Sequence, residues 1–119
     1  MARVSQTQTV YENLRLELRR GSLILAVLGA LGREQYGYTL RKSLAAAGMP
    51  VDEGTLYPLL RRLEAQGLLE SQWREEDKRN KRFYRLTAAG NVVFARLTVE
   101  WRQIGEAVAS LHTNSDVGE

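Results

Sequence analysis

The sequence predicts a mainly α-helical fold with a small β-hairpin, and three observations carry that prediction. Four leucines between positions 56 and 63 recur at helical spacing and make one apolar stripe. Gly67 ends this helix, and two short runs of β-forming residues follow, separated by a charged segment. A last helix begins after Thr87. Three helices, a hairpin and a closing helix in this order indicate a winged helix-turn-helix with a C-terminal helix.

Length and composition limit the class of protein. The chain has 119 residues, which suits one domain with a core of its own. It has no cysteine, so disulfides and thiolate metal sites are excluded. No run approaches the ~20 apolar residues of a membrane span, and the N-terminus lacks the apolar segment of a signal peptide. We therefore expect a cytoplasmic protein without a membrane segment.

Polar composition, hydrophobic periodicity and the positions of glycines predict the first elements of the chain. Residues 1–9 are polar, and we expect a flexible arm there. A first helix is expected from about Val10 to Leu31, interrupted at Gly21 and ended by Gly32. A second, short helix is expected over residues 37–47.

The third helix is expected over roughly residues 52–66, with Asp52 as its N-cap. Pro58 lies within this span, where it removes one backbone hydrogen bond and crowds the preceding turn. Two interpretations remain open. The helix either starts nearer Thr55, which leaves Pro58 in its first turn, or it bends at Pro58.

The C-terminal half is expected to hold the hairpin and the last helix. Strands are predicted over residues 68–74 and about 82–86, with a charged tip over residues 75–80. Thr87 caps a helix that runs from Ala88 to about Leu111. The expected organisation is therefore a winged helix-turn-helix over residues 10–87, a C-terminal dimerisation helix over residues 88–112 and a flexible tail over residues 113–119.

The exposed side of the third helix carries a pattern that indicates DNA binding. Arg61 and Arg62 lie opposite the leucines, and arginine donors match phosphate oxygens and the O6/N7 edge of guanine. Taken alone, two arginines on a surface helix are more often simply solvated than bound to DNA. The neighbouring helix favours DNA, because it begins at Tyr36-Gly37-Tyr38 and a helix N-terminus attracts phosphate.

The hairpin supplies a further basic feature. Lys78, Arg79 and Lys81 cluster near its tip, beside an acidic run over residues 75–77. The acidic run favours a role in solubility, whereas the basic cluster favours contacts with the DNA backbone or minor groove, which position a domain and read little sequence. Three aromatic residues are expected to pack the hairpin against the body of the domain, namely Trp73, Phe83 and Tyr84.

Apolar residues step by three and four along the last helix and form a heptad seam. They are Phe94, Leu97, Trp101, Ile104, Val108 and Leu111. Such a seam requires a partner helix, which is either the chain's own first helix or the same helix of a second copy. We expect a homodimer through the last helix, aided by Leu14 and Leu18 of the first, because paired winged domains read two half-sites.

Trp101 is unusual in such a seam, because the indole is large and its N–H group requires a partner. It either fills the core of the dimer interface or lines a pore between the subunits, where planar aromatic ligands stack.

Catalysis finds no support in the sequence. His112 is the only histidine and lies at the expected tail, and the chain has no cysteine nucleophile and no glycine-rich phosphate loop. We expect a protein that is not an enzyme and that requires no cofactor and no metal.

Together, these motifs resemble the PadR family of bacterial transcriptional regulators. The resemblance covers about residues 15–112 and rests, in order, on Tyr36-Gly37-Tyr38, Gly54–Pro58, Leu60–Glu64, Gly67–Trp73 and Tyr84–Gly90. The short C-terminal helix resembles the compact branch of the family, which includes multidrug-responsive members. The resemblance implies a winged-helix homodimer that binds a palindromic operator on double-stranded DNA, represses a nearby promoter, often its own, and responds to an effector.

The resemblance also assigns residues. On the family pattern Tyr38, Thr55, Tyr57 and Arg61 would contact DNA, and Lys78, Arg79 and Lys81 would form the wing contacts. Trp101 falls where multidrug-responsive members carry a tryptophan that stacks on planar drugs, which implies a site for a planar aromatic effector. The alternative is a winged-helix adaptor that binds other proteins and not DNA, because a fold does not fix a function.

Overall fold

The computed structural model describes the backbone of residues 2–117 and the side chains of residues 5–112. Within these residues, four helices and three short strands follow one another. They are α1 (Ala2–Ala30), β1 (Gln35–Tyr36), α2 (Gly37–Ala46), α3 (Glu53–Ala65), β2 (Leu69–Glu76), β3 (Arg79–Leu86) and α4 (Ala88–Val117). The order confirms the predicted mainly helical, winged helix-turn-helix architecture.

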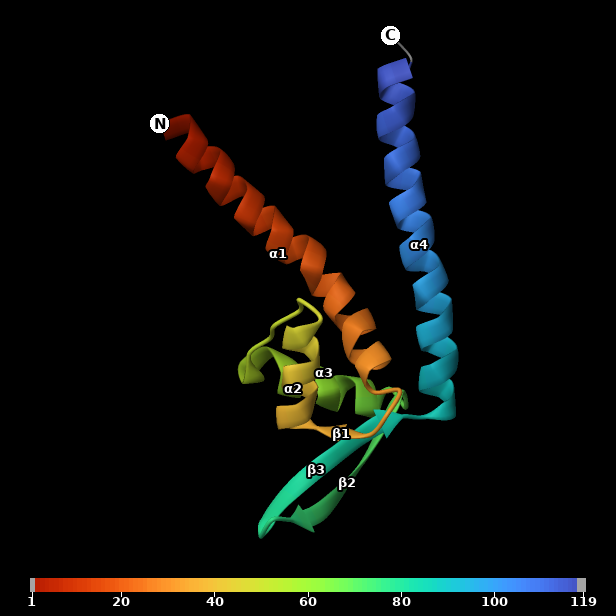
Figure 1. Cartoon of the computed structure of the whole chain (residues 1–119). Helices are drawn as coiled ribbons and strands as arrows, with labels where there is room; N and C mark the ends of the chain where they lie inside the picture. Colours follow the sequence, from red (N-terminus) through yellow and green to blue (C-terminus); the bar gives the residue numbers. More distant parts are fainter. Residues whose placement is uncertain (1, 118–119) are drawn as a thin grey trace.

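The molecule has a small body from which two long helices extend (Figure 1). The body holds α2, α3 and the sheet, and α1 and α4 diverge from it toward the two termini. The hairpin projects from the opposite end of the body. None of the helices over residues 2–117 combines the length and apolar character that a bilayer crossing requires.

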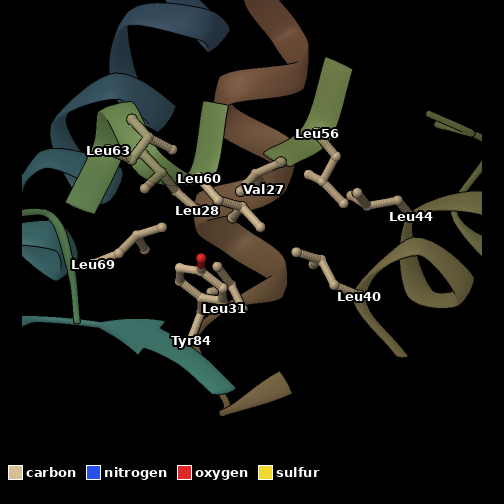
Figure 2. Packing of buried hydrophobic residues seen from close by; sticks show 10 residues of the cluster. All are labelled: Val27, Leu28, Leu31, Leu40, Leu44, Leu56, Leu60, Leu63, Leu69 and Tyr84. Atoms are coloured by element: carbon tan, nitrogen blue, oxygen red, sulfur yellow. The ribbon is translucent and has the colours of Figure 1, made fainter. Parts of the chain in front are cut away.

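The core forms where the C-terminal part of α1 meets α2, α3 and the sheet. Figure 2 shows its side chains converging from all of these elements. They are Val27, Leu28, Leu31, Leu40, Leu44, Leu56, Leu60, Leu63, Leu69 and Tyr84. The predicted leucine stripe is therefore confirmed, although Leu59 lies at its half-buried edge. The Arg19 guanidinium donates to the carbonyl oxygen of Gly48 and so ties α1 to the turn after α2.

The sheet is antiparallel in the order β1-β3-β2. Gln35 pairs with Tyr84 and Tyr36 with Phe83, so β1 adds a third strand that the sequence analysis missed. The hairpin is also longer than predicted, because most of its charged tip is paired. Only Asp77 and Lys78 form the turn, with φ of 53° and 63°. Two residues at positive φ match the twist of the flanking strands.

Both long helices extend beyond their predicted ends. Residues 2–9, expected to be a flexible arm, belong to α1, and Gly21 does not interrupt that helix. The Thr9 hydroxyl donates to the carbonyl oxygen of Ser5, one turn away. Polar residues can extend a helix that is already formed, because propagation avoids the cost of nucleation. For the same reason, the expected tail at residues 113–119 begins as helix, because α4 continues to Val117.

The helix α3 begins at Glu53 and contains Pro58, so the alternative of a start nearer Thr55 is wrong. Asp52 has the extended backbone of an N-cap residue, as predicted. Its side chain makes no capping hydrogen bond, because its carboxylate accepts the Thr55 hydroxyl at 2.7 Å instead.

The start of α4 is held against the start of the hairpin. The Thr87 hydroxyl accepts a hydrogen bond from the Gly90 backbone at 3.0 Å, which confirms the predicted cap. The same hydroxyl donates to the Gly67 carbonyl at 2.7 Å. The helix approaches so closely that a Cβ at Gly90 would overlap the carbonyl oxygen of Leu68. A glycine is therefore required at position 90 by space and not by backbone conformation.

We expect Gly90→Ala to lower the free energy of unfolding by about 1–3 kcal/mol, because the added methyl group meets backbone that cannot move aside cheaply. Chemical denaturation measures the change. Ala89→Ser, at the exposed neighbouring position, is the control and is expected to change stability by less than about 0.5 kcal/mol. Equal stability of the Gly90→Ala variant and the wild type would contradict this packing.

Candidate nucleic-acid interface

The outward side of α3 is the centre of the candidate site. Leu56, Leu60 and Leu63 face the core, and Arg61 is exposed on the opposite side. Within the described residues Arg61 takes part in no ion pair, so its five donors are available to a ligand.

The structure separates Arg61 from Arg62. Successive residues of a helix point about 100° apart, and Arg62 lines a groove between α3 and α1. Glu17 and Arg20 of α1 line the same groove. The two arginines that the sequence analysis placed together therefore face different surroundings, and Arg61 points more directly away from the core.

Tyr57 joins α3 to the start of α2. It is half-buried, and a Cβ at Gly37 would overlap its hydroxyl group. The glycine between the two tyrosines of the Tyr36-Gly37-Tyr38 motif thus makes room for a side chain of α3. This contact brings the N-terminus of α2, which the sequence suggested as a phosphate-binding helix end, beside α3.

Tyr38 is exposed at the first turn of α2. Lys42 follows one turn later, with its ammonium 5.3 Å from the centre of the Tyr38 ring. Lys42 was not predicted from the sequence, although its i, i+4 spacing from Tyr38 indicates that the two side chains are neighbours on the helix. Tyr36, the N-cap residue, makes no side-chain capping hydrogen bond. The aromatic ring, the cation and the helix N-terminus together suit a phosphate group.

One face of the hairpin is joined to α2 by a chain of aromatic contacts, edge-to-face between Tyr36 and Phe83 and stacked between Tyr36 and Tyr38. The Tyr36 ring lies 6.4 Å from the Tyr38 ring and 5.2 Å from the Phe83 ring, measured between centroids. The Arg74 guanidinium lies 3.8 Å from the centre of the Phe83 ring and pairs with Glu34 at 2.7 Å. These contacts set the angle between the wing and α2.

The opposite face of the hairpin is joined to α3. Glu64 of α3 accepts hydrogen bonds from the Arg82 guanidinium at 3.0 Å and from the Ser71 hydroxyl at 2.7 Å. Arg82 also donates to the Ser71 hydroxyl oxygen at 2.9 Å. The wing is therefore fixed to the recognition helix by a closed set of three polar groups.

The predicted wing residues do not share one environment. Lys78 and Arg79 are exposed at the tip and form no ion pair within the described residues. Lys81 has a side chain only 16% exposed, and its ammonium lies 3.4 Å from the Glu76 carboxylate. It also donates to the Tyr36 hydroxyl at 3.4 Å. Lys81 is thus engaged within the wing, and the acidic run partly neutralises it.

These contacts keep Lys81 charged. Desolvation lowers the pKa of Lys81, but the hydrogen bonds and charges of Tyr36 and Glu76 outweigh that effect and raise the pKa above its usual value. Thr55 is engaged locally as well. Its hydroxyl bonds to Asp52, and this bond lowers the pKa of the Asp52 carboxyl.

The aromatic residues of the hairpin differ from the prediction in one case. Phe83 and Tyr84 are buried, as expected, but Trp73 is 62% exposed. It lies on β2 beyond the part that α3 covers, so packing against the body of the domain is wrong for this residue. The apolar character of Trp73 alone does not reveal that β2 extends past the edge of the body at this position.

A second candidate site lies between the two long helices. Apolar side chains of α1 and α4 line an open groove of about 670 Å³. Leu18, Ile24 and Leu25 come from α1, and Leu97, Trp101, Ile104 and Val108 come from α4. Its volume lies within the range of small-molecule sites.

The residues predicted to form the dimer interface divide into two groups. Phe94 packs within its own chain, because its ring lies 3.2 Å from the position that a Cβ would take at Gly29 of α1. The others are exposed along the diverging halves of α1 and α4, and they are Leu14, Leu18, Leu97, Trp101, Ile104, Val108 and Leu111. The first helix of the same chain therefore covers the seam at Phe94, and among the described residues the rest of the seam stays exposed.

Comparisons with known proteins agree on one family. The model of the transcriptional regulator PadR-like family matches residues 24–96. The transcriptional regulator Rv3488 of Mycobacterium tuberculosis is 43% identical over 91 residues, which cover 76% of this chain and 82% of that protein. A crystal structure of a PadR family regulator from Eggerthella lenta superposes with a TM-score of 0.85 at 40% identity, covering 89% of this chain and 95% of the other. A PadR-like regulator from Bacillus cereus gives a TM-score of 0.71 at 26% identity, covering 80% and 95%.

Proposed function

The chain belongs to the PadR-like family of transcriptional regulators, and from this premise we propose that it is a dimeric, ligand-responsive repressor that binds a palindromic operator at a nearby promoter, such as its own. The family makes the chain a DNA-binding transcriptional regulator. The repressor activity, the operator and the ligand are the parts that we propose.

The arrangement of basic groups around α3 carries the proposal. Arg61 is exposed on α3, Tyr38 and Lys42 lie at the start of α2, and Lys78 and Arg79 lie at the tip of the wing. In a winged helix-turn-helix the recognition helix enters the major groove while flanking groups bind phosphates. We assign α3 to the major groove and the other cations to the backbone on either side.

Arg61 is the residue that we expect to read a base. Arg61→Ala should weaken operator binding by about 1–3 kcal/mol, because a bidentate arginine–guanine contact is lost. Arg62→Ala should cost less, because Arg62 lies on the α1 side of α3. Titration of a labelled duplex from the region upstream of the gene measures both. A larger loss for Arg62 than for Arg61 would contradict our placement of α3.

The salt dependence of duplex binding distinguishes a DNA-binding regulator from the alternative, a protein-binding adaptor. DNA binding through phosphate contacts weakens steeply as salt rises, because counterions are released. An adaptor would show no duplex binding even at low salt.

The exposed parts of α1 and α4 support a homodimer. Leu18 is 76% exposed, and Ile104 and Val108 are each 61% exposed. A continuous stripe of large apolar side chains on a soluble domain marks an interaction surface. A second copy that pairs through this stripe would present two recognition helices, and the half-sites would then lie roughly 34 Å apart.

We expect Ile104→Asp to convert the dimer to a monomer, because it places a charge within the apolar stripe. Sedimentation velocity measures the change, and operator affinity should fall with it. Gln103→Asp makes the same change in charge at the neighbouring exposed position, outside the seam, and should leave the dimer intact. A wild-type chain that sediments only as a monomer would refute the dimer.

The groove between α1 and α4 supports an effector site. Its lining is almost entirely apolar, and Trp101 lies on its wall with 56% of its surface exposed. A planar aromatic molecule would stack on the indole and bury both surfaces. Such a ligand changes DNA affinity only if it binds more tightly to one arrangement of the two helices.

Trp101→Ala should abolish quenching of tryptophan fluorescence by a planar aromatic compound, for which acridine serves as the probe, and should raise its dissociation constant. Trp73→Phe keeps Trp101 as the only tryptophan and should keep the quenching. Quenching that survives in Trp101→Ala with unchanged affinity would place the ligand away from this groove.

A further inference from the structure

Trp73 has no role in the site as described so far. It is an exposed indole on a hairpin whose other aromatic residues are buried. A single exposed apolar residue needs no explanation by itself. Trp73, however, occupies a defined position on the sheet and lies beside a charged side chain.

The strand register places Trp73 on the face of the hairpin that packs against α3. Trp73 pairs with Arg82, and Ser71 pairs with Tyr84. Paired residues of antiparallel strands share a face, and alternate residues of one strand share it too. Ser71 and Arg82 both bond to Glu64 of α3. Trp73 is therefore the next side chain outward from the contact with α3, in the angle between the recognition helix and the wing.

One neighbour with a fixed position lies beside the indole. The Arg82 guanidinium lies 5.7 Å from the centre of the Trp73 ring, and Arg82 is itself fixed by Glu64 and Ser71. A flat ring supported in this way loses little conformational freedom when it binds.

Arg61 belongs to the same neighbourhood. Burial raises the pKa of the Tyr84 hydroxyl, and the charges of Arg82 and Arg61 oppose that rise. Tyr84 lies on the same face of the hairpin as Trp73. The proposed base-reading arginine and the indole thus lie on the same side of the wing.

We propose that Trp73 contacts the backbone of duplex DNA, with its ring against a deoxyribose and its Nε1–H donating to a phosphate oxygen. This inference rests on the proposed function, because it requires α3 to lie in the major groove. A duplex seated on the outward side of α3 passes through the angle in which Trp73 stands. Tryptophan combines a broad apolar surface with one donor, which suits a sugar next to a phosphate.

The surroundings of Trp73 favour DNA over a protein partner. On its face of the hairpin the adjoining described residues are Arg82, which pairs with it across the strands, Ser71 and the buried Tyr84 toward the body, and Glu75 and Asn80 toward the tip. A protein interface has an apolar centre with a polar rim, and polar or charged residues surround the indole directly. The exposed Glu75 carboxylate would repel phosphate and so sets the outer limit of the contact.

The test is duplex titration at several salt concentrations, with the upstream-region duplex as the probe. Trp73→Ala should raise the dissociation constant about 10-fold without changing the slope of affinity against salt, because the indole carries no charge. Trp73→Phe, which keeps a ring and loses the donor, should lie between Trp73→Ala and the wild type. Lys78→Ala should reduce the slope by about 1. Gln72→Ala, on the opposite face of the same strand, should bind as the wild type does.

Each other outcome overturns the inference in a recognisable way. Wild-type affinity in Trp73→Ala would show that the indole does not touch DNA, while the proposed function would stand. A loss of affinity together with a lower salt slope and a lower melting temperature would show that Trp73 only supports the wing. Absence of duplex binding by the wild type at low salt would refute the proposed function and this inference with it.

Discussion

The structure depends on the burial of the last turns of α1. Val27, Leu28 and Leu31 are fully buried, and they share one core with leucines of α2 and α3 and with Tyr84 of the sheet (Figure 2). Close packing of this kind resists small displacements. The body is thus not independent of the long helices, because α1 contributes to the core of the body and also forms one wall of the apolar groove.

The orientation of the wing has a different physical basis. It is set by polar and aromatic contacts on both faces of the hairpin, with Glu64 and Arg82 on one face and Tyr36 and Phe83 on the other. Partly exposed ion pairs contribute at most about 1 kcal/mol each. These contacts therefore matter more for the orientation of the hairpin than for the stability of the fold, since contacts on opposite faces prevent the hairpin from rotating in either direction. The acidic run near the tip belongs to the same arrangement, because it holds Lys81.

The sequence predicted what periodicity and local chemistry determine. The leucines of α3, the Thr87 cap and the order of elements all follow from spacing and residue type. It missed features that depend on tertiary geometry. A strand of two residues has no period to detect, so β1 was invisible. The different surroundings of Arg61 and Arg62, the internal engagement of Lys81 and the exposure of Trp73 depend on which parts of other elements lie beside them. The ends of α1 and α4 were misplaced because composition says little about how far a formed helix continues.

The uninterrupted length of α1 has a mechanical consequence. Its 29 residues form a rod roughly 44 Å long at the usual helical rise. Pivoting such a rod about its midpoint by about 5° carries each end through roughly 2 Å. In a symmetric pair the two movements add to about 4 Å, which is comparable with the ~3.4 Å step from one base pair to the next. In the proposed dimer, a planar ligand that opened α1 and α4 by this small angle would therefore change the spacing of the two α3 helices by about one base-pair step.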